Sequence, residues 1–316
     1  MKPIRVEDVT KIFTTSIIGR KKVKALQNIT FQLDEGENLA IMGPSPSGKT
    51  TLLKMIAGIY LPDKGDIHIY NHSVKRKTEE VRRLTYYISP QIQLNKKLTV
   101  REVIRYFKKI TGKEINTQVT KLLSEVEIHP KNINKRIETL SETQTIVLKL
   151  ALGLIKEPKI LLLDNIFSSL EPKVRESFQT AIEEITNITL LIIDRDMEAL
   201  NRFCKKVLLL SKEGKMITIG PVSKLLKDYP YKYDIEVTLK KTQKREVTEI
   251  YKYPHQKMGT MIRFYLKDEN EVLNLTEALL KREKEIIKLQ ISGIDIEDIY
   301  YWILNRQREK DISIKK

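Results

Sequence analysis

Cysteine and long hydrophobic segments are what this 316-residue sequence most clearly lacks. Its one cysteine, Cys204, excludes an internal disulfide and fits a protein of the reducing cytosol. The longest apolar runs, such as Ile160–Leu163 and Leu190–Ile193, have the length of strands, whereas a helix that crosses a bilayer needs about 20 apolar residues. With 41% hydrophobic and 31% charged residues, the composition is typical of a soluble globular protein.

Negative charge is also scarce relative to positive charge. The formal net charge is +16, and most of the excess lies before residue 231. A basic surface attracts nucleic acid or anionic lipid headgroups. It is equally typical of a lysine-rich soluble surface without a specific partner, so charge alone leaves these alternatives open.

Strand and helix patterns alternate along the first two thirds of the chain. Strands are predicted at 3–13, 28–33, 38–42, 160–164, 190–193 and 207–210. Helices are predicted from 49, over 99–126 with a break at Gly112, over 141–155 and over 173–186. Because the later strands are apolar throughout, they predict an α/β domain whose core sheet is parallel and covered on both faces.

The pattern changes near residue 229, where a small α+β domain is predicted to begin. Its strands are expected at about 233–239, 246–252, 260–266 and 286–291, with helices over 269–284 and from 295. We therefore predict two domains, residues 1–228 and residues 229–316.

Residues 43–50, Gly-Pro-Ser-Pro-Ser-Gly-Lys-Thr, fit the Walker A pattern G-x-x-x-x-G-K-[ST]. The segment lies between a predicted buried strand and a helix, where backbone N–H groups and the helix N-terminus attract phosphate oxygens. Lys49 adds a cation for the β- and γ-phosphates, and Thr50 adds a hydroxyl for Mg²⁺. Pro46 removes one donor from this loop, because proline has no N–H.

Asp164 ends the apolar strand that begins at Ile160. In a phosphate-loop fold, a carboxylate at such a strand end holds Mg²⁺ directly or through water. The sequence therefore predicts a site for ATP and Mg²⁺ built from the loop and Asp164.

Together with further motifs in the same order, these segments resemble ABC transporter ATPases over about residues 3–225. Tyr-Ile-Ser-Pro-Gln at 87–91 resembles the Q-loop, and Leu-Ser-Glu-Thr-Gln at 140–144 stands where the family has its L-S-G-G-Q signature. Ser-Ser-Leu-Glu at 168–171 resembles the D-loop, and Asp-Arg-Asp at 194–196 aligns with the T-H-D of the switch loop. The resemblance implies a P-loop NTPase fold of the ABC cassette type, with an antiparallel N-terminal subdomain and a helical insertion at about 92–152.

The resemblance also implies roles for single residues. Phe13 would stack on adenine, although a phenylalanine at a strand end is also an ordinary core residue. Gln91 would contact Mg²⁺ or the attacking water and relay to the membrane subunit. The predicted nucleotide-binding residues are Phe13, Gly43, Ser45, Ser47, Gly48, Lys49, Thr50 and Thr51, and the predicted Mg²⁺ ligands are Thr50, Gln91 and Asp164. The signature and dimer contacts are predicted at Ser141, Glu142, Thr143, Gln144, Ser168 and Glu171, and the catalytic or auxiliary positions at Gln91, Asn165 and Arg195.

Several of these positions depart from the family pattern. Asn165 replaces the glutamate that orients the hydrolytic water, and an amide is not a general base. Arg195 replaces the switch histidine with a permanent cation that has no acceptor nitrogen. Glu142 and Thr143 replace the signature glycines, and Glu171 replaces the D-loop aspartate. We therefore predict that ATP hydrolysis is weak or absent.

Residues 294–300, Ile-Asp-Ile-Glu-Asp-Ile-Tyr, resemble the S-L-E-D-V-F stretch near the end of drug-, bacteriocin- and sodium-exporter ATPases. The alternative is an ordinary helix start with Asp295 as its cap. The resemblance favours an exporter subunit.

The sequence as a whole indicates a peripheral ATP-binding subunit on the cytoplasmic face of the cell membrane. Its expected partners are a separately encoded integral-membrane permease and a second ABC ATPase subunit, in a homodimer or a heterodimer around Mg-ATP. A non-catalytic regulatory or scaffold subunit is an alternative. A soluble ABC protein that acts on ribosomes or nucleic acid ranks last, because such proteins usually carry two cassettes. No nucleic-acid partner is therefore expected.

Overall fold

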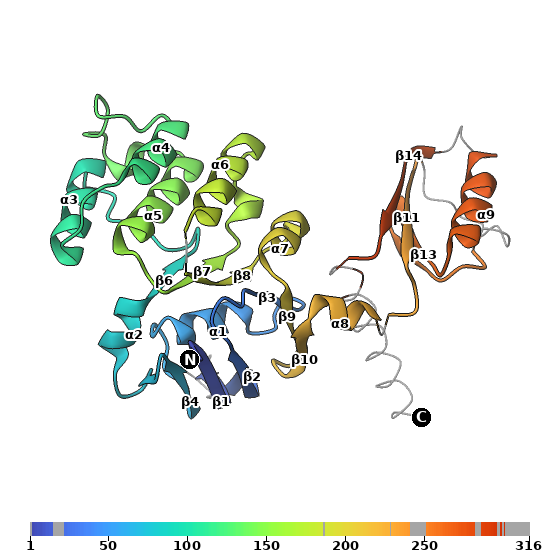
Figure 1. Cartoon of the computed structure of the whole chain (residues 1–316), viewed down its shortest axis with the longest axis horizontal. Helices are drawn as coiled ribbons and strands as arrows, with labels where there is room; N and C mark the ends of the chain where they lie inside the picture. Colours follow the sequence, from blue (N-terminus) through green and yellow to red (C-terminus); the bar gives the residue numbers. More distant parts are fainter. Residues whose placement is uncertain are drawn as a thin grey trace. The chain divides into compact units, whose positions relative to one another are not determined.

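The computed structural model describes residues 2–14, 22–185, 187–227, 229–240, 251–281, 286–295, 298 and 300. The chain divides into two compact units, Met1–Pro221 and Val222–Lys316, and each is described by itself (Figure 1). The predicted domain limits, 1–228 and 229–316, remain a prediction. No helix among the described residues is both long enough and apolar enough to cross a membrane.

The centre of the first unit is a six-stranded sheet with the order β10-β9-β3-β8-β7-β6. The strands are β3 (Leu39–Met42), β6 (Thr85–Ile88), β7 (Ile160–Asp164), β8 (Thr189–Ile193), β9 (Lys206–Leu210) and β10 (Met216–Pro221). All neighbours pair in parallel except β10, which is antiparallel to β9. Every residue of β3, β7 and β8 is buried, which confirms the predicted parallel core covered on both faces.

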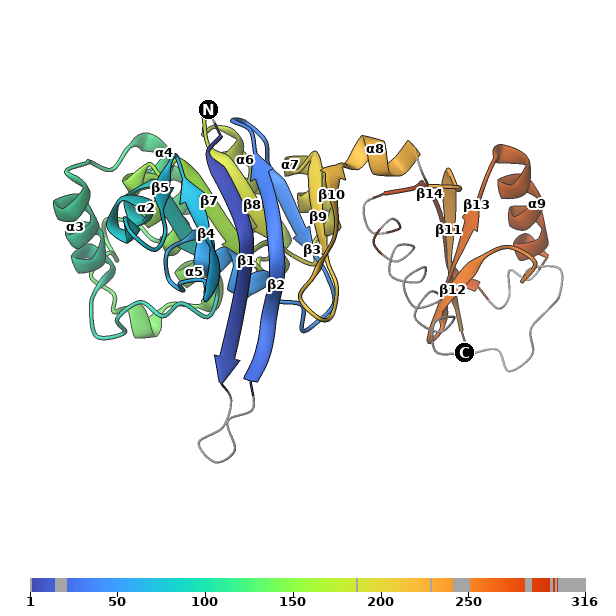
Figure 2. The same ribbon diagram turned by 90° about the horizontal axis from the view of Figure 1, so that it is seen from below.

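A second, antiparallel sheet of the first unit has the order β2-β1-β4-β5. Its strands are β1 (Ile4–Thr14), β2 (Lys22–Leu33), β4 (Lys64–Ile69) and β5 (His72–Ser73) (Figure 2). β2 begins earlier than the predicted strand at 28–33. The prediction missed its first residues because they are exposed and show no apolar alternation. Buried side chains from both sheets and from α1 (Lys49–Ile56) form one hydrophobic core.

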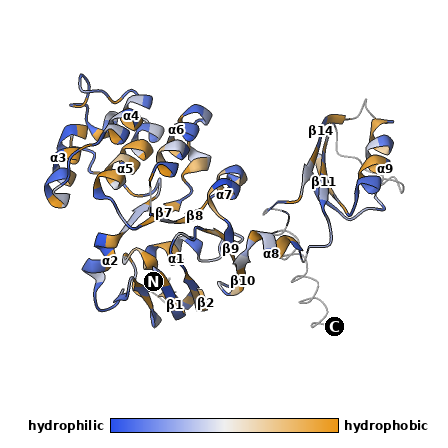
Figure 3. Cartoon of the chain, viewed as in Figure 1, coloured by the Kyte–Doolittle hydropathy of each residue, from blue (hydrophilic) through white to orange (hydrophobic). Residues whose placement is uncertain are grey.

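Helices cover both faces of the central sheet, with α1 on one side and α5–α7 on the other in Figure 1. Besides α1 they are α2 (Thr78–Leu84), α3 (Val100–Thr111), α4 (Thr117–Glu125), α5 (Glu142–Lys156), α6 (Pro172–Glu183) and α7 (Met197–Phe203). Short 3₁₀ turns form at Ile137–Thr139 and Phe167–Ser169. The apolar sides of α1 and α5 appear in orange in Figure 3.

Local capping fixes both ends of α3, and its C-terminal end is the predicted break between α3 and α4. The Thr99 side chain accepts from the Glu102 N–H in a capping box, and Gly112 ends α3 with a φ of 69°. By contrast, α2 has Val81 as its one buried residue, so its sequence shows no helical periodicity.

Among its described residues, the second unit contains an antiparallel sheet with the order β12-β13-β11-β14 and the helices α8 and α9. Its elements are α8 (Val222–Lys227), β11 (Tyr233–Leu239), β12 (His255–Met258), β13 (Met261–Leu266), α9 (Glu269–Leu280) and β14 (Ile286–Gly293). β11, β13, α9 and β14 confirm four of the predicted elements. Of the strand predicted at 246–252, residues 246–250 lie outside the described residues, as does most of the helix predicted from 295.

Candidate nucleotide-binding site

Four segments with predicted functions meet at one edge of the central sheet. The Walker A loop follows β3, residue 195 follows β8, Asp164 ends β7 and Gln91 follows β6. Because these strands are parallel and neighbours in the order β3-β8-β7-β6, their carboxyl ends lie at the same edge. Ligands of open α/β sheets bind at this edge.

The Walker A loop depends on glycine at position 48. Gly48 precedes α1 with a φ of 83°, a left-handed conformation that disfavours other residues. A Cβ atom there would lie 2.3 Å from the Ala25 carbonyl oxygen and 2.6 Å from Leu26 Cδ2. Glycine at this position therefore allows the loop to pack against β2.

The other predicted loop residues occupy different depths. Ser47 is buried, Ser45 is exposed, and Gly43, Thr50 and Thr51 are half-buried. The peptide bond between Ser45 and Pro46 is cis. α1 begins at Lys49, immediately after Gly48 of the loop.

The Lys49 ammonium group lies inside the loop. It donates to the carbonyl oxygens of Gly43 at 2.7 Å and Pro44 at 3.0 Å, and to Ser47 Oγ at 3.2 Å. Burial lowers the pKa of Lys49, the Asp164 carboxylate opposes this effect, and the positive charge of Arg195 lowers the pKa further. Lys49, Asp164 and Arg195 therefore share one electrostatic environment.

Asp164 is fully buried, and each of its carboxylate oxygens accepts a hydrogen bond. The Tyr87 hydroxyl donates to Oδ2 and the Asn165 side-chain amide donates to Oδ1, both at 2.7 Å. Burial and the neighbouring Asp164 charge raise the pKa of Tyr87. Asn165, which is predicted to take the place of the family's catalytic glutamate, thus contacts Asp164 itself.

The predicted D-loop and switch loop are joined by Asp194. Its carboxylate accepts from the backbone N–H of Phe167 at 2.7 Å and of Ser168 at 3.0 Å. It also accepts from the backbone N–H of Arg195 at 2.8 Å and of Asp196 at 3.1 Å. The side chains of Ser168 and Arg195 are exposed.

Glu171 is exposed at the N-terminus of α6, where its side chain makes no capping hydrogen bond. Arg175, one turn farther along α6, is better fixed. Arg175 forms an ion pair of 2.6 Å with Asp196 and donates to the Leu170 carbonyl oxygen at 3.1 Å. The segment around Glu171 is therefore anchored while its own carboxylate faces solvent.

The predicted signature segment forms the start of α5. Ser141 Oγ accepts from the Gln144 N–H at 3.1 Å, and Gln144 Oε1 accepts from the Ser141 N–H at 3.0 Å, which makes a capping box. Glu142 is exposed and Thr143 is half-buried. Gln144 also donates to the Val126 carbonyl oxygen at 2.9 Å, so the described hydrogen bonds of its side chain stay within the helical region.

A buried lysine connects α5 to the Q-loop. Lys149 is 3% exposed and donates to the carbonyl oxygens of Ser89 at 2.9 Å and Pro90 at 3.3 Å. Burial lowers its pKa, and the Glu142 carboxylate opposes this effect. Gln91 is exposed, and its Oε1 accepts a hydrogen bond from the Ser89 hydroxyl.

Sequence reasoning missed the roles of Tyr87 and Lys149. A lysine inside the apolar run of α5 is a signal that could have been used, because such a cation needs buried acceptors. Tyr87 carried no comparable signal, because tyrosine is common in half-buried strands.

Phe13 lies in β1 and is half-buried. Its ring meets the Tyr60 ring edge-on at a centroid distance of 5.6 Å, and Lys11 Nζ lies 5.4 Å from its centroid. The adenine-stacking role of Phe13 remains a prediction.

Thr50, Gln91 and Asp164 supply the oxygen ligands that Mg²⁺ prefers. In kind, this set therefore fits the ion. Both Asp164 oxygens and Gln91 Oε1 already accept side-chain hydrogen bonds, however. In the part of the chain that the structure describes, no group of three or more His, Cys, Asp or Glu side chains is placed to hold a metal.

Comparison with known proteins identifies the family that the first unit resembles. Residues 26–168 match the model of the ABC transporter family. The chain is 28% identical to ABC transporter A family member 8 of Dictyostelium discoideum, over 75% of this chain and 29% of that protein. It is 30% identical to the glucose import ATP-binding protein GlcV of Saccharolobus solfataricus, over 70% of this chain and 63% of that protein. The chain thus spans less than two thirds of the length of these relatives.

Solved structures share the fold. A dimer of the ATP-binding cassette MJ0796 with ADP and phosphate superimposes with a TM-score of 0.60 at 24% identity, covering 69% of this chain and 98% of that one. An ATP-binding subunit of an ABC transporter gives a TM-score of 0.61 at 21% identity, covering 71% and 92%. These structures show the fold, and residues 26–168 match the ABC transporter family, so the chain contains an ABC transporter ATP-binding domain.

Proposed function

We propose that this chain is the ATP-binding subunit of an ABC exporter in which nucleotide binding, with slow or no hydrolysis, drives a separate membrane permease. The observation that carries the proposal is the Walker A loop closed around the Lys49 ammonium group at the carboxyl edge of the sheet, where buried Asp164 ends β7. The Walker A loop begins at the same edge, so phosphate groups bound there would meet backbone donors and two cations.

Slow hydrolysis is supported by Asn165. Its side-chain amide donates to Asp164, and its backbone N–H donates to the Ile193 carbonyl oxygen at 2.7 Å. An amide in this position has no basic group to accept a proton from water. Catalysis by a positioned general base contributes about 100- to 10,000-fold, so its loss alone accounts for slow turnover.

The signature segment supports the same conclusion for a dimer. In the family resemblance, this segment faces the γ-phosphate held by the partner cassette. Glu142 is exposed there and would bring a negative charge toward that phosphate. At about 4 Å and an effective dielectric of about 20, two like charges repel by about 4 kcal/mol.

The proposed partners are a second cassette and an integral-membrane permease, with the chain on the cytoplasmic face of the membrane. Export is supported by the resemblance of residues 294–300 to exporter ATPases. Several relatives at 30% identity are named as import proteins, for glucose or spermidine and putrescine. Transport direction is therefore tested by reconstituting the complex with its native permease in vesicles and following the cargo.

Replacing Lys49 tests ATP binding directly. Lys49→Ala removes the cation of the loop, and we expect calorimetry to show an affinity loss of about 10- to 100-fold, since charge-assisted hydrogen bonds contribute about 1.5–3 kcal/mol. Lys64→Ala, at an exposed position of β4, is the matched control and should bind ATP like the unmodified protein. Equal affinity of Lys49→Ala and the unmodified protein would contradict the proposal.

A further inference from the structure

The outer side of α3 combines cations with exposed apolar side chains. α3 lies at the margin of the first unit in Figures 1 and 2. Its exposed residues are three cations, one carboxylate and two apolar groups, namely Arg101, Glu102, Arg105, Tyr106, Lys109 and Ile110. Tyr106 and Ile110 are 60% and 58% exposed, whereas Val100, Val103 and Ile104 on the opposite side are buried. α3 is therefore amphipathic, and its outer side, termed the α3 face, contains both positive charge and apolar surface.

Tertiary contacts bring a second basic segment to the start of α3. The backbone N–H of Arg101 donates to the Ile133 carbonyl oxygen at 2.9 Å, and Arg101 Nε donates to Asn134 Oδ1 at 2.8 Å. The Val100 N–H donates to the Lys135 carbonyl oxygen at 3.0 Å. Together with the residues just before α3, this segment adds five exposed cations, namely Lys96, Lys97, Lys131, Lys135 and Arg136. Cations from two distant segments thus lie at the same end of one helix.

The positive charge of the whole chain is concentrated in this region. Residues 96–136 contain 11 Lys and Arg against 4 Asp and Glu, so they carry +7 of the net charge of +16. In the part of the chain that the structure describes, the ion pairs of this region belong to Lys108, Lys113 and Arg136 and not to cations of the α3 face. The Glu102 carboxylate accepts from the Thr99 N–H at 2.7 Å as part of the helix cap. Most of this positive charge is therefore available to an anionic partner.

We propose that the α3 face binds a membrane surface that contains anionic lipids. A basic helix with exposed aromatic and aliphatic side chains suits the headgroup region, where the apolar side chains enter the interface and the cations meet lipid phosphates. Nucleic acid would attract the same cations, but an exposed isoleucine offers it neither stacking nor a hydrogen bond. The inference goes beyond the proposed function, because it concerns α3 and requires no bound nucleotide.

Co-sedimentation of the purified full chain with lipid vesicles tests the inference. We expect binding to vesicles of equal parts phosphatidylcholine and phosphatidylglycerol to be at least about tenfold tighter than to phosphatidylcholine alone, and to weaken as salt is added. Equal binding to the two kinds of vesicle, or no binding to either, would overturn the inference. Lys49→Ala should bind the mixed vesicles like the unmodified protein, so the failure of the ATP site and the failure of the α3 face are distinguishable.

Charge reversal assigns the binding to α3. Arg105→Glu with Lys109→Glu should weaken binding to the mixed vesicles at least about 25-fold, since each cation near an anionic surface contributes about fivefold. Lys205→Glu with Lys212→Glu is the matched control, because it changes the net charge equally at two exposed positions elsewhere in the first unit. This control should weaken binding by less than about fivefold, the contribution of one cation. Equal losses in the two double variants would overturn the inference.

Removing the apolar side chains distinguishes lipid from nucleic acid. Tyr106→Ser with Ile110→Ser keeps every charge and should weaken binding to the mixed vesicles about tenfold, because less apolar area enters the interface. Vesicle binding that is unchanged in this variant would contradict the inference. So would release of the unmodified protein from the vesicles by polyuridylic acid at an equal concentration of phosphate groups, which would assign the α3 face to nucleic acid.

Discussion

Two buried carboxylates, one in each unit, have opposite surroundings. Asp164 in the first unit is fully buried and accepts from two neutral donors, the Tyr87 hydroxyl and the Asn165 amide. Asp298 in the second unit is 1% exposed and forms an ion pair of 3.3 Å with Arg263. The side-chain hydrogen bonds to Asp164 thus come from neutral groups, whereas Asp298 is paired with a cation.

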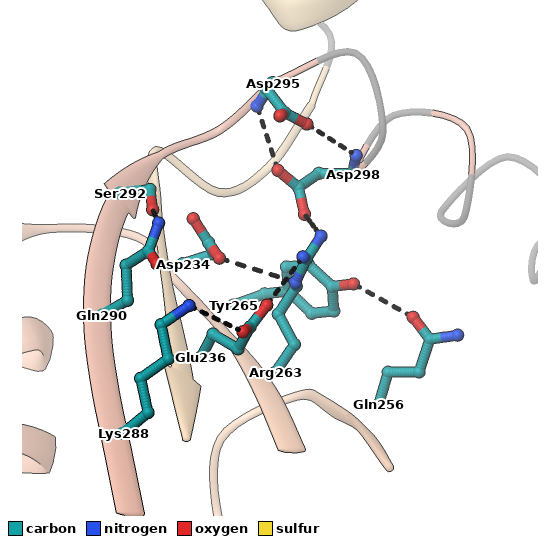
Figure 4. A network of polar contacts seen from close by, with 10 residues as sticks. All are labelled: Asp234, Glu236, Gln256, Arg263, Tyr265, Lys288, Gln290, Ser292, Asp295 and Asp298. Carbon is teal, nitrogen blue, oxygen red and sulfur yellow. Dashed lines mark hydrogen bonds and ion pairs between the residues drawn. The ribbon is translucent and has the colours of Figure 1, made fainter. Parts of the chain in front are cut away.

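The second site, the Arg263 cluster, consists of Asp234, Glu236, Arg263 and Asp298 and is drawn in Figure 4. Glu236 lies directly opposite Arg263 across β11 and β13, at a distance of 3.0 Å. Asp234 lies 3.7 Å from Arg263. Burial raises the pKa of Asp234 to about 6 and that of Asp298 to about 7, and Arg263 opposes both shifts. The cluster therefore places three acidic side chains around one arginine, and burial makes the charged forms of Asp234 and Asp298 costly.

The cluster also accounts for the positions of Asp295 and Asp298 in the segment that resembles exporter ATPases. Asp295 Oδ1 accepts from the Asp298 N–H at 3.2 Å, and Asp298 Oδ2 accepts from the Asp295 N–H at 2.9 Å. Such a reciprocal pair is typical of a helix start, which supports the capping interpretation of Asp295. Asp298 additionally joins this segment to β13 through Arg263.

The largest expected effect comes from restoring the predicted catalytic residues at the nucleotide-binding site of the first unit. Asn165→Glu combined with Arg195→His, Glu142→Gly and Thr143→Gly should raise ATP hydrolysis by about 100-fold or more, because a general base and the signature are both repaired. Asn165→Glu with Arg195→His alone should give little increase. Phosphate release measures turnover, and adding Lys49→Ala should abolish the gain. Full activity in the unmodified protein would contradict the argument.

Removing the cation of the Arg263 cluster should have the next largest effect. Arg263→Met leaves Asp234 and Asp298 buried without their cation, so the second unit should lose about 3–5 kcal/mol in free energy of unfolding. Lys288→Met is the control, because Lys288 is 57% exposed and pairs with Glu236 at 3.7 Å, which predicts a loss of at most about 1 kcal/mol. Urea denaturation of the full chain, with hydrogen exchange in β11 and β13, measures both. Equal losses of unfolding free energy in the two variants would show that Arg263 does not offset the charges of the buried carboxylates.

The smallest expected effect is a pH dependence confined to the second unit. Asp234 and Asp298 have raised pKa values, so the folded unit binds more protons than the unfolded chain between about pH 4 and pH 7. Stability should therefore fall by at most about 4 kcal/mol from pH 5 to pH 8, because the two folded pKa values lie about one and two units above pH 5. Asp298→Asn should flatten this dependence, as followed by hydrogen exchange at both pH values. An increase in stability over this range would contradict the cited shifts.

Features set by neighbouring residues could be predicted from the sequence. Gly48 at the end of the Walker A loop, and the caps formed by Thr99 with Glu102 and by Ser141 with Gln144, depend on residues that are close in the chain. The parallel core was predictable for a similar reason, because β7 and β8 are apolar at nearly every position. Short or exposed elements such as α2 and the start of β2 were not, because they bury few side chains.

The sequence by itself therefore determined the Walker A motif and the parallel core, and it predicted the replacement of the catalytic residues. Only the tertiary structure decided which donors meet the buried carboxylates. Tyr87 reaches Asp164 across 77 positions, Lys149 reaches Ser89 across 60, and Arg263 reaches Asp298 across 35. Such contacts depend on strand register and on the packing of helices against the sheet, and a sequence pattern of period two or 3.6 specifies the face of a residue but not its partner.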